Sequence, residues 1–419
     1  MDSYTKQSFS DEKDLKSRLR KAKKIFFKLY KTKEEIIVRS PGRAEIIGNH
    51  TDYNHGFTLS NCISKSVLVL LKKRKDNVVR IYSTNFPTNK PLEFIFDKIK
   101  RDEINRWANY PKGVILELEK RGIKLCGCDI LVDSNVPTSG GVSSSAALEL
   151  AVALGFLKLA KKKLKSMELA LLCQNAENQF VQSPCGFLDQ GTIAFGKSKK
   201  MVYMDYEPKA NEPVSEVKSI SANIDKMGAS FVVAVDKNAK RELGLSGYPA
   251  RRKMCEESLP FWAKALKRKI GSLRDVSVLE FEKHKDELDK LNSVMRKRVE
   301  HIVYENFRVL ESIKALRKKD LKKFGTLLTE SGNSALSLYE LDEKTPELTH
   351  LYNFGQTLQG VLGIRNMGGG FSATILALVR KSRVKDFTKE MALSYKNKFG
   401  GNLEFIDFKV TNGAGVLQA

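Results

Sequence analysis

The sequence lacks any long apolar run. Nowhere in its 419 residues does an uncharged apolar stretch approach the roughly 18 to 20 residues that are needed to cross a bilayer. The opening segment, MDSYTKQSFSDEKDLK, also lacks the basic and then apolar order of an export signal. We therefore expect a cytoplasmic protein that has no membrane partner.

Metal-ligating side chains are few and scattered. The 6 cysteines show no regular spacing, and in a chain without an export signal they are expected to be reduced thiols rather than a disulfide framework. Cys126 and Cys128 lie two residues apart, but the 5 histidines supply no second pair of ligands at short spacing. A structural zinc site is therefore disfavoured.

Recognisable nucleic-acid-binding patterns are also missing: there is no aromatic RNA-binding motif, zinc finger or helix-turn-helix signal. The formal net charge of +24 nevertheless invites a nucleic-acid interpretation. The lysines of LKLAKKKLK and LRKKDLKK, however, are spread along amphipathic helical patterns and mixed with acids. Solvated helix faces explain them better, so we expect no specific nucleic-acid partner.

The chain has enough apolar residues for two domains, since 42% of its side chains are hydrophobic. No internal repeat or linker rich in proline and serine separates them. Helical and β-rich segments are mixed without the regular alternation of a doubly wound sheet, which favours an α+β fold. We place the boundary between an N-terminal domain of residues 1–205 and a C-terminal domain of residues 206–419.

Periodicity gives the expected elements. Strands are predicted at residues 34–40, 66–73, 78–83, 92–97, 128–134, 200–206, 229–236, 373–379 and 403–410. Helices are predicted at residues 15–29, 105–119, 144–159, 166–181, 249–266, 280–291, 295–316 and 321–331.

Residues 191–198, GTIAFGKS, satisfy the P-loop pattern of glycine, four residues and Gly-Lys-Ser. A P-loop follows a buried strand and opens a helix. Here turn-like residues precede the pattern and a strand-like run, KKMVYMDY, follows it. The context therefore disfavours a P-loop.

Three other glycine-bearing segments recur in order: SPGRAEIIGNHTDYNHG (residues 40–56), VPTSGGVSSSAALE (136–149) and RNMGGGFSATILALV (365–379). Between them come RWANYPKGV (106–114), CQNAENQF (173–180), PCGFLDQ (184–190) and GYPARRKMCEE (247–257). In this order they resemble the galactokinase family of the GHMP small-molecule kinases over nearly the whole chain. The resemblance implies a two-domain α+β fold, with an N-terminal domain like ribosomal protein S5, and an active site in the cleft between the domains.

The serine-rich segment VPTSGGVSSSAALE is suited to an anion. Backbone N–H groups at a helix N-terminus concentrate partial positive charge, which favours a phosphate without a lysine. A helix cap at a tight turn explains the same residues equally well. The resemblance implies that the segment binds the phosphates of ATP, through Ser139, Gly140, Gly141, Ser143, Ser144 and Ser145. It also assigns Mg²⁺ to Ser145 and Glu177.

An acidic residue near a helix start, such as Asp189 in PCGFLDQ, is ordinarily a favourable partner of the helix dipole. Arg43 in SPGRAE reads on its own as a surface arginine at a strand end. The resemblance instead makes Asp189 the catalytic base for the sugar hydroxyl and Arg43 the catalytic cation beside it. Phosphoryl transfer needs mainly alignment and charge neutralisation, which these residues can supply.

The GNHTDY turn is dense in hydrogen-bonding side chains that suit a polyhydroxylated ligand, although turns favour the same residues. By resemblance, the sugar contacts are Arg43, Asn49, His50, Asp52, Gly186, Asp189 and Tyr248. Trp107 and Tyr110 match the aromatic residues on the adenine side, with a core role as the alternative.

The sequence departs from the family pattern GRxNLIGEHTDY, because Glu45 stands in the Asn place and Asn49 in the Glu place. An amide can donate as well as accept and does not repel a C6 carboxylate. The resemblance therefore implies an ATP- and Mg²⁺-dependent kinase, expected as a monomer, for the C1 hydroxyl of galactose. Galacturonate or arabinose kinases are the alternative, and a non-catalytic sensor of sugar and ATP ranks lower. Gly332, in place of a usual histidine, has no assigned consequence.

Overall fold

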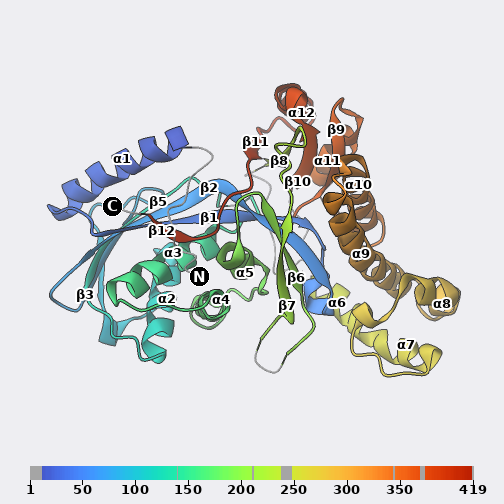
Figure 1. Ribbon diagram of the computed structural model, residues 1–419, viewed down its shortest axis with the longest axis horizontal. Helices are drawn as coiled ribbons and strands as arrows, with labels where there is room; N and C mark the ends of the chain where they lie inside the picture. The colour runs from blue at the N-terminus through green and yellow to red at the C-terminus, as the bar shows by residue number, and fades with distance from the viewer. Residues whose placement is uncertain are drawn as a thin grey trace.

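The computed structural model describes residues 12–138, 140–209, 212–236, 248–342, 345–368 and 373–417. Two antiparallel-rich sheets lie side by side with helices packed on their faces (Figure 1). The α+β class predicted from the sequence is confirmed. No helix in these ranges is long and apolar enough to cross a membrane.

The larger sheet holds the strands of the N-terminal half. Its main path, in spatial order, is β12 (Gly415–Leu417), β1 (Ile36–Ile47), β2 (Phe57–Lys73), β5 (Cys128–Ser134), β3 (Val78–Ser83) and β4 (Leu92–Ile95). The first residues of β2 also pair with β6 (Lys200–Asp205), which pairs with β7 (Glu216–Ser221). Only β3 and β5 run parallel among these pairs. The long β2 therefore links the main path of the sheet to the β6–β7 pair.

Helices cover both faces of this sheet, which explains why β2 reads as a continuous apolar run. Leu68 and Leu70 pack against α1 (Glu12–Tyr30) on one face. Val67, Val69 and Leu71 belong to the core on the other face. The helices of that face are α2 (Asn109–Lys120), α3 (Ser144–Leu159), α4 (Ser166–Asn175) with the π-helical turn Ala176–Val181, and α5 (Leu188–Phe195).

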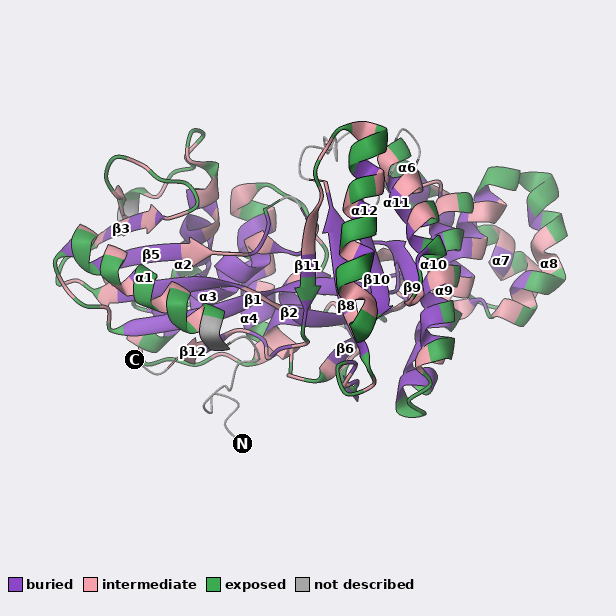
Figure 2. Cartoon of the chain, turned by 90° about the horizontal axis from the view of Figure 1, so that it is seen from above, coloured by how far each residue is buried: buried purple, intermediate pink, exposed green. Residues whose placement is uncertain are grey.

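The smaller sheet is antiparallel, in the order β11 (Glu404–Phe408), β8 (Ala229–Val235), β10 (Thr374–Arg380) and β9 (Val361–Asn366). Helices α11 (Pro346–Thr357) and α12 (Val384–Phe399) bury one face of it. The remaining helices are α6 (Tyr248–Glu257), α7 (Leu259–Leu266), α8 (Val278–Leu291), α9 (Ser293–Arg317) and α10 (Leu321–Ser337). Short 3-10 turns lie at Asp52–Asn54, Phe96–Lys98, Arg106–Ala108, Leu273–Asp275 and Lys381–Arg383. Figure 2 shows buried strands, with exposure concentrated on the outer faces of helices such as α1, α8 and α12.

Most predicted elements occur within a few residues of their expected bounds, but β1 continues to Ile47 and β2 begins at Phe57, well beyond the predicted 34–40 and 66–73. The predicted helix at residues 249–266 is two helices that meet at Ser258, because Pro260 at the start of α7 cannot continue the hydrogen-bond ladder. The predicted helix at 166–181 loosens to π-helical geometry at Ala176. Strands β7, β9 and β12 and helices α11 and α12 were not predicted.

The GTIAFGKS segment is the end of α5 followed by β6, so it has the reverse of P-loop order, as predicted. The proposed boundary at residues 205 and 206 stays a prediction. Two later strands, β7 and β12, add to the larger sheet. All six cysteines are free thiols, in agreement with the expected reduced state.

Candidate functional site

The first glycine-bearing segment forms β1 and the turn that follows it. Arg43 lies within this strand rather than at its end, and its backbone N–H donates to the Val142 carbonyl at 3.0 Å. A Cβ atom on Gly42 would lie 2.5 Å from that same carbonyl oxygen. Only glycine therefore allows the serine-rich segment to pack directly on β1.

Arg43 and Asp189 meet at the contact between three predicted motifs. Arg43 Nε and Nη2 donate to Asp189 Oδ1 at 2.8 and 2.5 Å. Arg43 Nη1 also donates to the Gly141 carbonyl, and Ser143 Oγ donates to Asp189 Oδ2. The Arg43 side chain is 9% exposed and that of Asp189 is 25% exposed. The structure therefore joins the two predicted catalytic residues and the serine-rich segment in one cluster.

The serine-rich segment turns sharply into α3. Gly141 and Ser143 both have left-handed backbone conformations, with φ of 63° and 58°. The helix begins at Ser144, and its N-cap residue Ser143 makes no side-chain cap. The first N–H groups of α3 are therefore left for an anion, in line with the predicted phosphate role of Gly140, Ser144 and Ser145. Ser139 lies outside the described residues.

Two buried carboxylates lie beside α5: Glu149 on α3 and Glu177 in the π-helical turn after α4. Gln190 Nε2 donates to Glu149 Oε2 at 3.1 Å and to Glu177 Oε2 at 2.7 Å. Burial, and then the Glu177 charge, raise the pKa of Glu149 well above its usual value. Burial and Asp189 likewise raise the pKa of Glu177, against hydrogen bonds that include one from Ser145. The predicted metal residues Ser145 and Glu177 are thus in contact.

The sugar-binding turn predicted from GNHTDY places Asp52 against PCGFLDQ. A Cβ atom on Gly186 would lie 2.9 Å from Asp52 Oδ2. Burial first, and the charges of Glu45 and Asp189, raise the pKa of Asp52 to about 6, although backbone N–H groups oppose this. His50 has a φ of 62° and its Nδ1 lies 2.9 Å from the Tyr53 hydroxyl. The turn therefore brings Asp52 against Gly186 of the PCGFLDQ segment and His50 against Tyr53.

The side chain of Tyr248, a further predicted sugar contact, lies outside the described residues, as do residues 369–372 of the third glycine segment. Of that segment, Gly368 is described, and its carbonyl accepts a hydrogen bond from Asn49 Nδ2 at 3.0 Å. The segment thus reaches the sugar-binding turn.

Of the two predicted adenine-side aromatics, Trp107 lies in the 3-10 turn before α2 and Tyr110 in the first turn of α2. Burial, together with the charges of Glu177 and Glu149, raises the pKa of Tyr110 to about 12. Trp107 stacks on Phe86, with ring centroids 6.2 Å apart and planes inclined by 13°. Phe86 is 46% exposed and was missed from the sequence, because an isolated aromatic in a polar loop carries no periodic signal.

Glu45 and Asn49, the two exchanged residues, remain partners. Asn49 Nδ2 lies 3.3 Å from Glu45 Oε1, and Arg365 Nη2 lies 3.2 Å from the same oxygen. Asn49 Oδ1 accepts from Asn366 at 3.4 Å. Glu45 and Asn49 are thus in contact, and the Glu45 carboxylate on β1 lies beside the buried Arg365.

Gly332, which stands in place of the usual histidine, allows a buried tyrosine to pack closely on α10. A Cβ atom at this position would lie 2.5 Å from Tyr352 Cε2, so the Tyr352 ring packs directly on α10. Tyr352 donates from its hydroxyl to the Thr329 carbonyl at 2.9 Å. A histidine side chain would displace this buried tyrosine.

Comparisons with known proteins place the chain among small-molecule kinases. The family models described as GHMP kinases N terminal domain and Galactokinase galactose-binding signature match residues 109–197 and 24–73. The chain is 36% identical to a galactokinase of Clostridium tetani over 93% of this chain and 96% of that protein. It is 32% identical to a galactokinase of Staphylococcus carnosus, with coverage of 94% and 98%.

Solved structures agree with these sequence matches. The galactokinase of Lactococcus lactis complexed with galactose has a TM-score of 0.81 and 31% identity, over 95% of this chain and 99% of that one. A mevalonate kinase structure matches with a TM-score of 0.60 at 17% identity, over 90% and 99% of the two chains, which shows a shared fold.

Proposed function

Because the chain belongs to the galactokinase family of the GHMP kinases, we propose that it transfers the γ-phosphoryl group of ATP to the C1 hydroxyl of galactose. The observation that carries this function is the contact of Asp189 with both Arg43 and Ser143. Through this contact, β1, which leads into the sugar-binding turn, and the serine-rich segment both meet the Asp189 carboxylate.

In the proposed reaction, the C1 hydroxyl oxygen forms a bond to the γ-phosphorus while the bond from that phosphorus to the β,γ-bridging oxygen breaks. Asp189 accepts the hydroxyl proton, and ADP leaves with the electron pair of the broken bond. In this proposal, Arg43, which contacts Asp189, and the N–H groups at the start of α3 neutralise charge on the phosphoryl oxygens.

The donor set at Ser145 and Glu177 fits Mg²⁺, which prefers oxygen ligands and is commonly held by one or two carboxylates together with substrate phosphates. When bound there, the ion would neutralise phosphate charge. Gln190 and Glu149 fix the orientation of the Glu177 carboxylate.

The test is ADP release over a panel of galactose, galacturonate, arabinose, glucose and N-acetylgalactosamine. We expect galactose to give the highest kcat/KM. Preference for galacturonate would instead assign Asn49 to a C6 carboxylate. Binding of ATP and sugar without ADP release would indicate a sensor.

Galactose affinity should fall at acidic pH. The pKa of Asp52 is about 6, so its carboxylate is ionised at pH 8 and accepts hydrogen bonds from sugar hydroxyls, but is largely protonated at pH 5. Burial, and then the nearby His301 and Arg251, hold the pKa of His50 well below its usual value, so His50 stays neutral over this range. Calorimetric titration with galactose should show about tenfold weaker binding at pH 5 than at pH 8. A flat profile would contradict the role of Asp52.

Replacing Trp107 with alanine should raise the ATP KM about fivefold, since aromatic stacking contributes about 1 kcal/mol. The galactose KM should stay within twofold. The sequence has 2 tryptophans, so Trp262→Phe is a matched control on a side chain that is fully buried. A nucleotide-induced change in tryptophan fluorescence should survive in the control and disappear in Trp107→Ala. If Trp107→Ala keeps both the signal and the ATP KM, adenine does not contact Trp107.

A further inference from the structure

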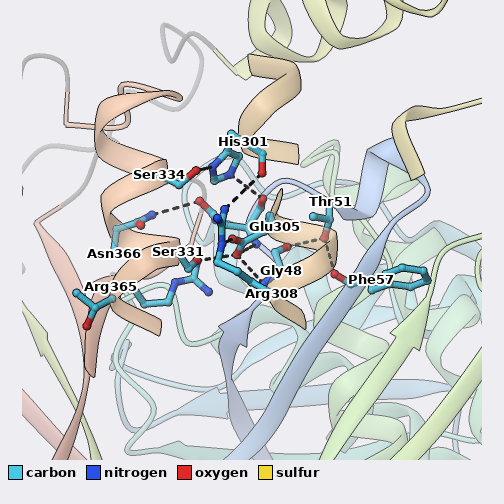
Figure 3. Close-up of polar contacts among 12 residues, drawn as sticks. Gly48, Thr51, Phe57, His301, Glu305, Arg308, Ser331, Ser334, Arg365 and Asn366 are labelled. Atoms are coloured by element: carbon cyan, nitrogen blue, oxygen red, sulfur yellow. Dashed lines mark hydrogen bonds and ion pairs between the residues drawn. The ribbon is translucent and has the colours of Figure 1, made fainter. Parts of the chain in front are cut away.

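The turn that carries His50 and Asp52 is held at its start by α9. Glu305, near the middle of this helix, accepts the backbone N–H groups of Gly48 at 3.0 Å and Asn49 at 3.1 Å through one oxygen, Oε1 (Figure 3). No motif in the sequence drew attention to this residue. The contact fixes the backbone directly before the predicted sugar ligands.

The next residue of α9 holds the end of the same turn. Asn306 Oδ1 accepts the backbone N–H of Phe57 at 3.1 Å. Gly56 must be glycine here, since a Cβ atom would lie 2.1 Å from that amide oxygen. Thr51 Oγ1 lies 2.7 Å from the Gly48 carbonyl and 2.6 Å from that of Phe57, so it links the two ends. Two consecutive helix residues thus bracket the turn.

Four donors within the protein converge on the Glu305 carboxylate. Ser331 Oγ donates to Oε1 at 2.6 Å, and Arg308 Nε donates to Oε2 at 2.7 Å. The residue is fully buried. Burial alone would raise the pKa of the Glu305 carboxyl, but Arg308, His301 and Arg365 hold it below its usual value. Glu305 is therefore a buried anion that makes four hydrogen bonds within the protein.

His301, one turn earlier on α9, adds a contact to the same backbone. Its Nε2 lies 3.2 Å from the Asn49 carbonyl, and its Nδ1 lies 2.8 Å from Ser334 Oγ on α10. Helix α9 therefore holds both backbone polar groups of Asn49, and α10 supports the two side chains that do so. The buried ion pair of Glu305 with Arg308 contributes little to stability by itself, because the cost of desolvating both charges offsets much of their attraction.

We propose that Glu305 and Asn306 are positioning residues for galactose, which set the backbone of residues 48–57 without touching the sugar. The proposal rests on the proposed function, since it takes His50 and Asp52 as sugar ligands. It assigns α9 a role in substrate affinity that is separate from the phosphoryl-transfer residues.

The test uses Glu305→Gln, Asn306→Ala and the control Glu311→Gln, which changes an acid on the same helix whose partner is Lys314 at the surface. An amide has one acceptor oxygen where the carboxylate has two, so four converging donors cannot all be satisfied. We expect the galactose KM to rise about tenfold in Glu305→Gln and about threefold in Asn306→Ala, with the ATP KM within twofold. The control should match the parent.

Amide hydrogen exchange of the ligand-free proteins gives an independent readout. Amide exchange of residues 48–57 should be faster in Glu305→Gln and Asn306→Ala, and exchange of strand β8 (residues 229–235) should stay unchanged. Faster exchange in both segments would indicate general destabilisation and overturn the proposal. Faster exchange confined to the turn, with an unchanged galactose KM, would also overturn it. If the parent does not use galactose at all, the proposed function is wrong. If amide exchange in residues 48–57 of the variants is unchanged, Glu305 and Asn306 do not position this turn.

Discussion

Asp189→Asn should lower kcat about a thousandfold, the middle of the range for loss of a positioned general base, while the galactose KM changes only a few-fold. Asparagine keeps the size of the side chain and one oxygen for Arg43, which donates to Asp189 Oδ1 at 2.8 Å. It loses the ability to take the proton. The measurement is steady-state ADP release at saturating ATP and galactose.

The control is Asp129→Asn, which changes an aspartate that is more buried than Asp189 and that an arginine likewise holds with two bonds. Arg80 Nε and Nη2 lie 2.6 and 2.8 Å from the Asp129 oxygens. Asp129 lies on β5, outside the cluster of Arg43, Ser143 and Asp189. Its variant should lose stability and keep kcat. A kcat for Asp189→Asn within tenfold of the parent would remove Asp189 from the role of base.

Asp52→Asn should affect binding and stability in opposite directions. The galactose KM should rise about fiftyfold, which corresponds to the loss of a hydrogen bond to a charged group. At pH 8 the melting temperature should rise, because burial, Glu45 and Asp189 raise the pKa of Asp52 to about 6 and so disfavour its ionised form. The folded state binds this proton more tightly than the unfolded state does, so the Asp52 carboxyl destabilises the fold as pH rises through 6.

The stability difference between Asp52→Asn and the parent should therefore shrink between pH 8 and pH 5, as the parent becomes protonated. Calorimetric unfolding at both pH values checks this sign. Asp129→Asn again provides the contrast, because Arg74 and Arg80 hold that charge and its loss should destabilise the protein. A lower melting temperature for Asp52→Asn at pH 8 would contradict the destabilising effect of the ionised Asp52 carboxylate. An unchanged galactose KM would contradict its role in sugar binding.

Local sequence patterns predicted the elements whose own apolar residues mark a buried face. The apolar run at 66–73 marks β2 because α1 and α3 cover both of its faces, and the predicted helix at 144–159 has the bounds of α3. Strands β7 and β12 were missed since their residues are partly exposed; β7 forms by pairing with the preceding strand β6, and β12 by pairing with the distant β1. Such pairing leaves no periodic signal in a short segment.

The site divides in the same way. Arg43, Asp189 and Ser143 belong to motifs that the sequence displays, and the structure brings them into contact. Gln190 was visible beside Asp189, but its bonds to two carboxylates depend on how α3 and α5 pack. Glu305 could not be predicted, because a glutamate on a charged amphipathic helix has the ordinary signature of a solvated face.

Strand β12 has a consequence for the order in which the molecule assembles. Val38 pairs with Val416, and Arg39 reaches the hydroxyl of Thr411 at 3.3 Å, so the strand that contains Arg43 gains its outer neighbour from residues almost four hundred positions later. During synthesis, this edge of the sheet stays open until residues 415–417 have left the ribosome. The edge of the sheet beside Arg43 is therefore completed only after the strands of the smaller sheet have been synthesised.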